Sequence, residues 1–234
     1  THADEKGCWE LQITTPAASF EEYTLTLTDG EQSVTLQHLL IGEVWLCAGQ
    51  SNMVMPLNGF DYCPISDSNN VIADAPNHPG IRMVTIKPTV KLSPQEYAEG
   101  SWQQPTTENA PKFSAAAYHY ALTLQRTLQI PIGVITCAWG GSRVEGWLPK
   151  EILQTYKDED LTLIGSDKTP VYLQSMLMYN GILYPCHKYT IKGFIWYQGE
   201  SNVRSSRTYA ERLATMVKHW RSIWKQGDLP FYYV

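Results

Sequence analysis

After Gly42 the sequence alternates short, almost continuous apolar segments with longer amphipathic ones, and this alternation limits the possible folds most strongly. Apolar runs without polar alternation are typical of parallel strands that are covered on both faces. We therefore predict an α/β fold with a doubly wound parallel sheet, which binds its ligands at the carboxyl ends of the strands. The predicted strands are residues 43–48, 81–86, 132–138, 191–197 and 230–234.

Two segments between or after these strands have helical periodicity. In residues 112–129, apolar side chains such as Phe113, Tyr120 and Leu124 fall on one face of a helix. Residues 206–224 repeat the pattern, with apolar residues three or four positions apart. Both segments are predicted to be helices that pack an apolar face on the sheet.

The first 40 residues have a different pattern. Segments 9–13, 23–28 and 34–36 alternate apolar and polar residues, and Asp29-Gly30 is a turn signal between the last two. This pattern predicts antiparallel β-structure with one solvated face. Three short strands are too few for an independent domain.

Composition and charge exclude several classes of function. The 234 residues carry a net charge of −5, so the basic face that binds nucleic acid is missing. Apolar runs are too short to cross a bilayer. The five cysteines contain no CxxC pair, the six histidines have no ligand spacing, and HExxH and phosphate-loop motifs are absent. We expect no metal, no cofactor, no nucleic-acid partner and no membrane span.

The first predicted strand ends in Gly49-Gln50-Ser51. A glycine before the serine allows a tight strand-to-helix bend that exposes the hydroxyl, and a helical turn cut short by Pro56 directs backbone N–H groups at an oxyanion. The arrangement is similar to a nucleophile elbow, although the second glycine of the G-x-S-x-G form is absent. By itself, a Gly-x-Ser turn is more often a helix cap.

The third predicted strand ends in a glycine pair within residues 137–147. The backbone of Gly140 or Gly141 is a candidate donor to an oxyanion, because glycine lets the backbone approach a ligand closely. A plain tight turn explains the pair about equally well.

The fourth predicted strand ends in the polar cluster of residues 198–202. The amides of Gln198 and Asn202 are candidate oxyanion donors, and Glu200 is a candidate acid. Carboxyl ends of parallel strands lie at one edge of a sheet, so the three turns are expected to form one crevice.

The blocks IGEVWLCAGQSNM (41–53), AWGGSRVEGWLP (138–149) and IKGFIWYQGESN (191–202) resemble the SGNH hydrolase superfamily. The resemblance is to its sialate O-acetylesterase branch, which is related to carbohydrate esterase family 6, and it extends from about Trp9 to the last residue. It implies an SGNH-hydrolase (flavodoxin-like) sheet over residues 41–234, with the C-terminal part of that domain missing. Residues 1–40 then correspond to a partial β-sandwich segment.

The resemblance also implies roles for individual residues. Ser51 matches the nucleophile. Gln198 and Asn202, with the backbone of Gly140 and Gly141, match the groups that hold the oxyanion. Glu200 matches a glutamate that some members of the wider esterase family use as the triad acid, whereas others use an Asp just before the histidine.

The family's catalytic histidine lies in an Asp-x-x-His block downstream of the strand matched by residues 230–234, and the chain contains no such block. We expect a missing C-terminal segment to supply this histidine, and the fragment alone to be nearly inactive. The six histidines present lie on predicted helices (His119, His219), before the fourth strand (His187), in the N-terminal region (His2, His38) and in a Pro-rich loop (His78).

The function implied by the resemblance is removal of O-acetyl groups from sialic acids, through an acetyl-enzyme on Ser51 and without a metal. The substrate is an O-acetylated sialic acid or glycan, which points to an extracellular or periplasmic location. An acetylxylan esterase or another carbohydrate acetylesterase is the nearest alternative.

Two further alternatives belong to other classes. A glycosidase needs a second carboxylate beside Glu200, and Glu145 is the other acid in the predicted crevice loops. A non-catalytic sugar-binding module would use Trp139, Trp147 and Tyr197 as stacking platforms.

Overall fold

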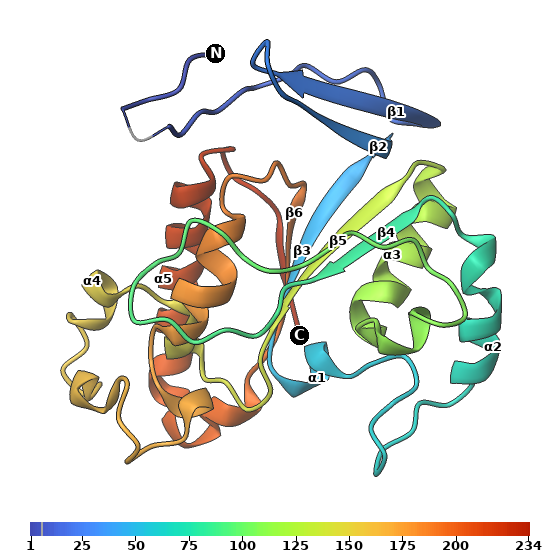
Figure 1. The fold of residues 1–234 in the computed structure, drawn as a ribbon. Helices are drawn as coiled ribbons and strands as arrows, with labels where there is room; N and C mark the ends of the chain where they lie inside the picture. Colours follow the sequence, from blue (N-terminus) through green and yellow to red (C-terminus); the bar gives the residue numbers. More distant parts are fainter. Residues whose placement is uncertain (6) are drawn as a thin grey trace.

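The computed structural model describes residues 1–5 and 7–234, which form a two-stranded sheet and a five-stranded sheet flanked by helices (Figure 1). The larger sheet has the order β4-β5-β3-β6-β7, and all neighbouring strands are parallel. This confirms the predicted α/β class, and the strand ends agree with the prediction to within two residues. The strands are β3 (Glu43–Gly49), β4 (Ile81–Thr85), β5 (Ile132–Ala138), β6 (Gly193–Tyr197) and β7 (Phe231–Tyr233).

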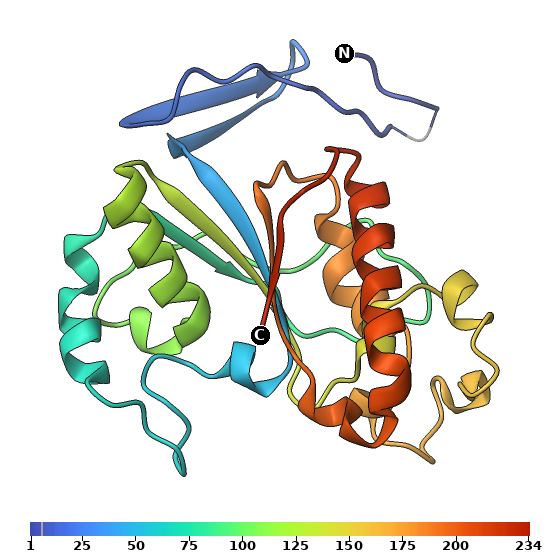
Figure 2. The ribbon, with the colours of Figure 1, turned by 180° about the vertical axis from the view of Figure 1, so that it is seen from behind.

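Side chains of the central strand β3 alternate between two hydrophobic cores. Trp45 and Cys47 lie in one core, and Leu46 and Ala48 lie in the other. Helices α2 and α3 cover the first face of the sheet and α5 covers the second, as Figures 1 and 2 show from opposite sides. Burial on both faces explains why this strand is apolar without alternation.

The helices are close to the predicted segments. Helix α3 (Ala115–Leu128) begins after Ser114, whose hydroxyl accepts a hydrogen bond from the N–H of Ala117 at 3.3 Å. Helix α5 (Ser206–Trp224) has the predicted bounds. The other α-helices are α1 (Ser51–Val54), α2 (Ser68–Asp74) and α4 (Lys150–Leu153).

Short helical turns connect these elements. One of them, η6 (Tyr179–Leu183), is a π-turn. The 3₁₀ turns are η1 (Ala75–Asn77), η2 (Ala110–Lys112), η3 (Val144–Trp147), η4 (Leu161–Leu163), η5 (Val171–Leu173), η7 (Tyr184–Cys186) and η8 (Glu200–Ser205). In the part of the chain that the structure describes, no helix combines the length and the apolar character that crossing a bilayer requires.

The N-terminal region forms the antiparallel hairpin of β1 (Ser19–Thr28) and β2 (Ser33–Ile41), as predicted for segments 23–28 and 34–36. The prediction of a strand at residues 9–13 is wrong, because this segment is irregular and pairs with no strand of the described chain. Alternating polarity predicts a strand only where a neighbour offers backbone hydrogen bonds. The hairpin lies at the amino ends of the large sheet, opposite α1 (Figure 1).

Candidate active site

The strand order brings the three polar turns to one edge of the large sheet. Strand β3 lies between β5 and β6, and its last residue, Gly49, is in register with Ala138 on one side and Tyr197 on the other. The turns that follow these strands therefore start side by side, near α1 (Figure 1). This is the edge where parallel α/β sheets bind their ligands.

The turn after β3 requires glycine at position 49. A Cβ on Gly49 would lie 2.1 Å from the carbonyl oxygen of Tyr197, and the φ angle of +148° is unfavourable for other residues. The close approach of the two backbones allows the N–H of Gln50 to donate a hydrogen bond to the carbonyl oxygen of Tyr197 at 3.0 Å. On the other side, the N–H of Trp139 donates to Gly49 O at 3.0 Å.

Ser51 is the first residue of α1 and is half-buried. Its hydroxyl and its backbone N–H make no hydrogen bond to any described residue of the chain. The first N–H groups of a helix have no acceptor within the helix, so this N–H remains available to a ligand. The helix stops at Val54, because the residue before Pro56 is held in an extended conformation.

The side chain of Gln50 joins the serine turn to the turn after β6. Gln50 is 3% exposed, and its Oε1 accepts hydrogen bonds from the N–H groups of Gly199 and Ser201, both at 3.3 Å. A buried amide that satisfies two backbone donors holds these segments in one relative position.

Asn52 makes the second link between the same turns. Its Nδ2 donates to the Oε1 of Glu200, which opens η8 and is exposed to solvent. In the described residues Glu200 therefore contacts the neighbour of Ser51, and no histidine is hydrogen-bonded to it.

Gln198 and Asn202 are buried, with exposed fractions of 2% and 1%. The Nε2 of Gln198 donates to the carbonyl of Ser142 at 3.0 Å and to the Oδ1 of Asn202 at 2.8 Å. The Nδ2 of Asn202 donates to both carboxylate oxygens of Glu145, at 3.2 and 3.0 Å. Since both amides use their hydrogens inside the protein, this arrangement makes them supports of the glycine turn rather than direct oxyanion donors.

The glycine turn after β5 presents a free backbone donor. Gly140 is exposed, has open space around its Cα, and its N–H has no acceptor among residues 1–5 and 7–234. Gly141 has a φ angle of +75°, and its carbonyl accepts a hydrogen bond from the Oγ of Ser201 at 2.8 Å. The N–H groups of Ser51, Gly140 and Gly141 are thus donors at this edge without an acceptor among the described residues.

Beneath the glycine turn lies a buried ion cluster. Glu145 is fully buried and accepts a hydrogen bond from the guanidinium of Arg212, which also contacts Asp158 at 2.7 Å. Burial by itself lowers the pKa of Arg212, but the hydrogen bond and charge of Glu145, with the charges of Asp158 and Glu159, outweigh it and raise the pKa overall. The cluster makes Glu145 inaccessible to substrate, so the alternative of a glycosidase that pairs Glu145 with Glu200 is not supported.

The aromatic residues proposed for a sugar-binding module are less exposed than expected. Trp147 has no exposed surface and packs edge-on against Trp196, with ring centroids 5.8 Å apart, so it is not a stacking platform. Trp139 and Tyr197 are half-buried and pack against the two cores. Part of each of these two rings is therefore buried against a hydrophobic core and is not available to a sugar.

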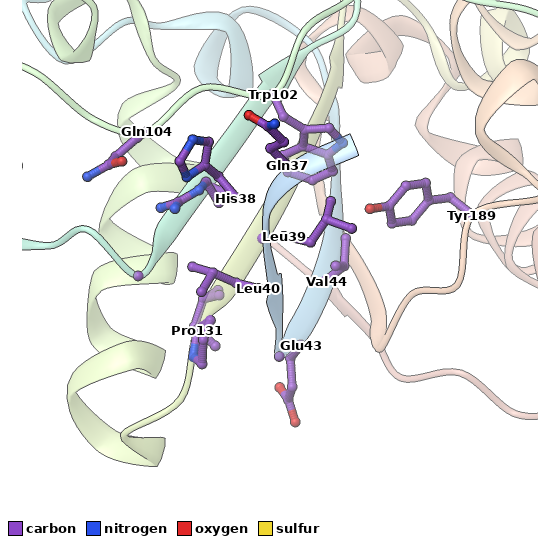
Figure 3. A pocket seen from close by; sticks show the side chains of 15 residues that line it. Gln37, His38, Leu39, Leu40, Glu43, Val44, Trp102, Gln104, Pro131 and Tyr189 are labelled. Atoms are coloured by element: carbon purple, nitrogen blue, oxygen red, sulfur yellow. The ribbon is translucent and has the colours of Figure 1, made fainter. Parts of the chain in front are cut away.

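A cavity of about 420 Å³ lies at the opposite, amino-terminal edge of the sheet, between the hairpin and β3 to β5. Figure 3 shows Trp102 and Tyr189 beside Leu39 and Val44 in its wall. The cavity contains none of the residues of the three turns, so it does not belong to the candidate active site. Within the described ranges, no cluster of three or more His, Cys, Asp or Glu residues is arranged to hold a metal ion.

Residues 41–234 match the model of a protein family described as carbohydrate esterase, sialic acid-specific acetylesterase. The chain belongs to this family. The predicted resemblance to the sialate O-acetylesterase branch is thereby confirmed.

Sialate O-acetylesterases of Homo sapiens and Mus musculus are 27% and 26% identical to the chain over 205 and 238 residues. These alignments cover 84% and 86% of this chain, but 38% and 43% of the relatives. The chain therefore spans about two-fifths of the length of these relatives. A solved carbohydrate acetylesterase from Xanthomonas citri superimposes with a TM-score of 0.86 and 30% identity, over 99% of this chain and 49% of that one.

Four of the six histidines of this family member have hydrogen-bond or ion-pair partners away from the serine. The Nε2 of His219 lies 2.9 Å from the hydroxyl of Tyr179, and burial lowers the pKa of this histidine. The Nδ1 of His187 lies 2.6 Å from the carbonyl of Tyr184. His78 and His38 pair with Asp74 and Glu22 at 2.9 and 2.8 Å, and His2 and His119 are exposed.

Sequence reasoning missed three residues that organise the candidate site. Gln50 and Asn52 flank Ser51 in the sequence, and this position beside the candidate nucleophile could have indicated their role. Arg212 was also detectable, because it is a charged residue on the apolar face of a predicted helix, between Tyr209 and Met216. Its partner Glu145 lies 67 positions away in the sequence, and no local pattern connects the two.

Proposed function

We propose that this chain provides the nucleophile and the oxyanion-binding turns of a carbohydrate esterase that removes O-acetyl groups, with sialic acids as the substrate class. The observation that carries the proposal is the half-buried, unpaired hydroxyl of Ser51 between the turns that follow β5 and β6. Membership of the sialic acid-specific acetylesterase family supports the substrate class. Acetylxylan or another acetylated carbohydrate is the alternative substrate, since the similar structure from Xanthomonas citri is that of a carbohydrate acetylesterase.

In this proposal the Oγ of Ser51 attacks the carbonyl carbon of the acetyl group. The bond between that carbon and the sugar oxygen then breaks, the sugar leaves as an alcohol, and water hydrolyses the acetyl-enzyme to acetate. The N–H groups of Ser51 and Gly140 donate to the oxyanion of the tetrahedral intermediate. Each such donor typically contributes a factor of about 100 to 1000 in rate.

The remaining polar residues act as supports in this scheme. Gln50 and Asn52 hold the serine turn to the turn after β6, while Gln198 and Asn202 hold the glycine turn. Such positioning matters because small displacements of reacting groups cost large factors in rate. No described histidine is hydrogen-bonded to Ser51, and four of the six have partners elsewhere, so we assign the proton of Ser51 to a histidine base outside residues 1–234.

The test is covalent labelling of the protein in its full cellular form with a fluorophosphonate, together with acetate release from O-acetylated sialic acid and from acetylxylan. We expect Ser51 to be labelled, and Ser51→Ala to abolish both labelling and acetate release. Ser101→Ala is the matched control, because Ser101 is exposed and its side chain makes no hydrogen bond in the described structure. Unchanged acetate release by Ser51→Ala would contradict the proposal. Cleavage of a glycosidic bond in place of the acetyl ester would contradict it as well.

A further inference from the structure

The ring of Tyr172 rests on the glycine turn. A Cβ placed on Gly141 would lie 2.8 Å from the Cδ2 and 3.2 Å from the Cε2 of Tyr172. The ring therefore occupies the space that a side chain at position 141 would fill. Tyr172 lies in the turn η5, 31 positions after Gly141, so this contact is invisible in the sequence.

A short series of contacts connects this ring to the proposed nucleophile. The carbonyl of Gly141 accepts a hydrogen bond from the Oγ of Ser201 at 2.8 Å. The N–H of Ser201 donates to the side chain of Gln50 at 3.3 Å, and Gln50 immediately precedes Ser51. These contacts place Tyr172 on the glycine turn that is hydrogen-bonded to the turn after β6, which in turn is held to the residue before Ser51.

The backbone on both sides of Tyr172 is firmly held. The carbonyl of Leu173 accepts hydrogen bonds from the Nε and Nη2 of Arg143 at 3.0 and 2.8 Å. The buried side chain of Gln174 binds the N–H of Gly165 at 2.6 Å and the carbonyl of Thr169 at 2.7 Å. An aromatic ring on such a fixed turn loses little conformational freedom when a ligand packs on it.

The ring nevertheless remains open to solvent. Tyr172 is 40% exposed, and within the described parts of the chain it has no hydrogen bond and no aromatic partner. A cavity of about 390 Å³ lies next to this turn, and its lining includes Leu173, which follows Tyr172, the hydroxyl residues Ser201 and Ser205, and the charged residues Arg143, Glu159, Asp160 and Arg204. A partly exposed aromatic ring beside hydroxyl, guanidinium and carboxylate groups suits a sugar, whose C–H face is apolar and whose rim carries hydroxyl groups.

We propose that Tyr172 is the platform on which the sugar ring carrying the acetyl group packs, with the adjoining cavity receiving the hydroxyl groups of the same glycan. This inference rests on the proposed esterase function. It assigns Tyr172 as the residue that makes the esterase selective for esters of sugars. The phenol hydroxyl has no role in the assignment, because the packing uses the ring face.

The experiment compares an O-acetylated sugar with a small aryl acetate that has no sugar. For Tyr172→Ala we expect kcat/KM on the acetylated sugar to fall about tenfold, the loss of one aromatic contact. The loss on the aryl acetate should be several times smaller, because this substrate has no sugar ring to pack on the tyrosine. Tyr172→Phe should match the wild type on both substrates, and Tyr172→Leu, which still fills the space over Gly141, should behave as Tyr172→Ala. Tyr97→Ala is the matched control, because Tyr97 is 85% exposed and does not touch the three turns.

Several outcomes would overturn the inference. Equal losses on both substrates would mean that Tyr172 only supports the glycine turn, and unchanged kinetics in Tyr172→Ala and Tyr172→Leu would mean that the sugar packs elsewhere. Failure of the wild type to hydrolyse either acetate would instead refute the esterase function, and the inference would fail with it. The aryl acetate therefore separates the two failures.

Discussion

The side-chain amide of Asn52 donates to the carboxylate of Glu200, which ties the residue after Ser51 to the first residue of η8. No histidine of the described residues is hydrogen-bonded to Glu200, and we propose that Glu200 positions the serine turn. A carboxylate that only accepts from an amide is replaceable by another acceptor, whereas a triad acid is not.

We therefore expect Glu200→Gln to retain kcat/KM for acetate release within about tenfold, because its amide oxygen still accepts from Asn52. Glu200→Ala should lose more, since Asn52 then lacks its partner. Glu211→Gln serves as the control, because Glu211 is an exposed carboxylate of α5. A loss of about 10,000-fold in Glu200→Gln, the size known for removal of a triad acid, would show that Glu200 acts on a histidine.

The two glycines of the proposed site predict opposite results. Gly49→Ala places a Cβ 2.1 Å from the carbonyl of Tyr197, so β3 and β6 must separate. We expect a loss of about 3 kcal/mol or more in the free energy of unfolding, measured by denaturant titration. Gly140→Ala is the matched control, because its Cβ meets nothing within 4 Å, and its stability should stay within about 0.5 kcal/mol of the wild type. Equal stabilities of the two variants would contradict the close packing of β3 on β6.

The pair of Arg212 and Glu145 predicts a strong coupling in stability. Arg212→Met leaves the fully buried Glu145 without its main cation, and Glu145→Met does the reverse. Each single variant should lose about 3–5 kcal/mol in the free energy of unfolding, because an unpaired buried charge is costly. The double variant should lose less than the sum of the two. Arg207→Met, at an exposed arginine of the same helix, should change stability little, and additive losses in the double variant would contradict the pairing.

Burial lowers the pKa of His219, which predicts a contribution to the pH dependence of stability. The unfolded chain binds a proton at this histidine more readily than the folded protein, so the contribution is present above the unfolded pKa, near 6.5. It is lost as the pH falls from about 6.5 through the lower pKa of the folded state. Denaturant unfolding at pH 7 and pH 5 should show a smaller decrease for His219→Gln than for the wild type. His119→Gln, at an exposed histidine, is the control, and an identical decrease in all three proteins would contradict the prediction.

Local sequence patterns were enough to find the strands of the large sheet and the helix α5. Continuous apolar runs mark strands that are covered on both faces, and a repeat of three to four residues marks a packed helix, so both signals are contained in neighbouring residues. The same reasoning failed for residues 9–13, whose alternation has no pairing strand in the described chain.

The proposed nucleophile could also be located from the sequence, because Gly49 and Ser51 stand at the end of an apolar run. The roles of Gln198 and Asn202 could not, since an amide in a motif donates either to a ligand or to the protein. The structure directs their hydrogens to Ser142, Asn202 and Glu145.

The sequence by itself determined the class of the fold, the positions of the three polar turns and the family resemblance, because these depend on residues that are close together in the chain. Only the tertiary structure decided that β3 lies between β5 and β6, that Arg212 neutralises Glu145, and that Tyr172 covers Gly141. Each of these contacts joins residues more than 30 positions apart. Their partners are selected by the packing of the whole sheet, which no local pattern encodes.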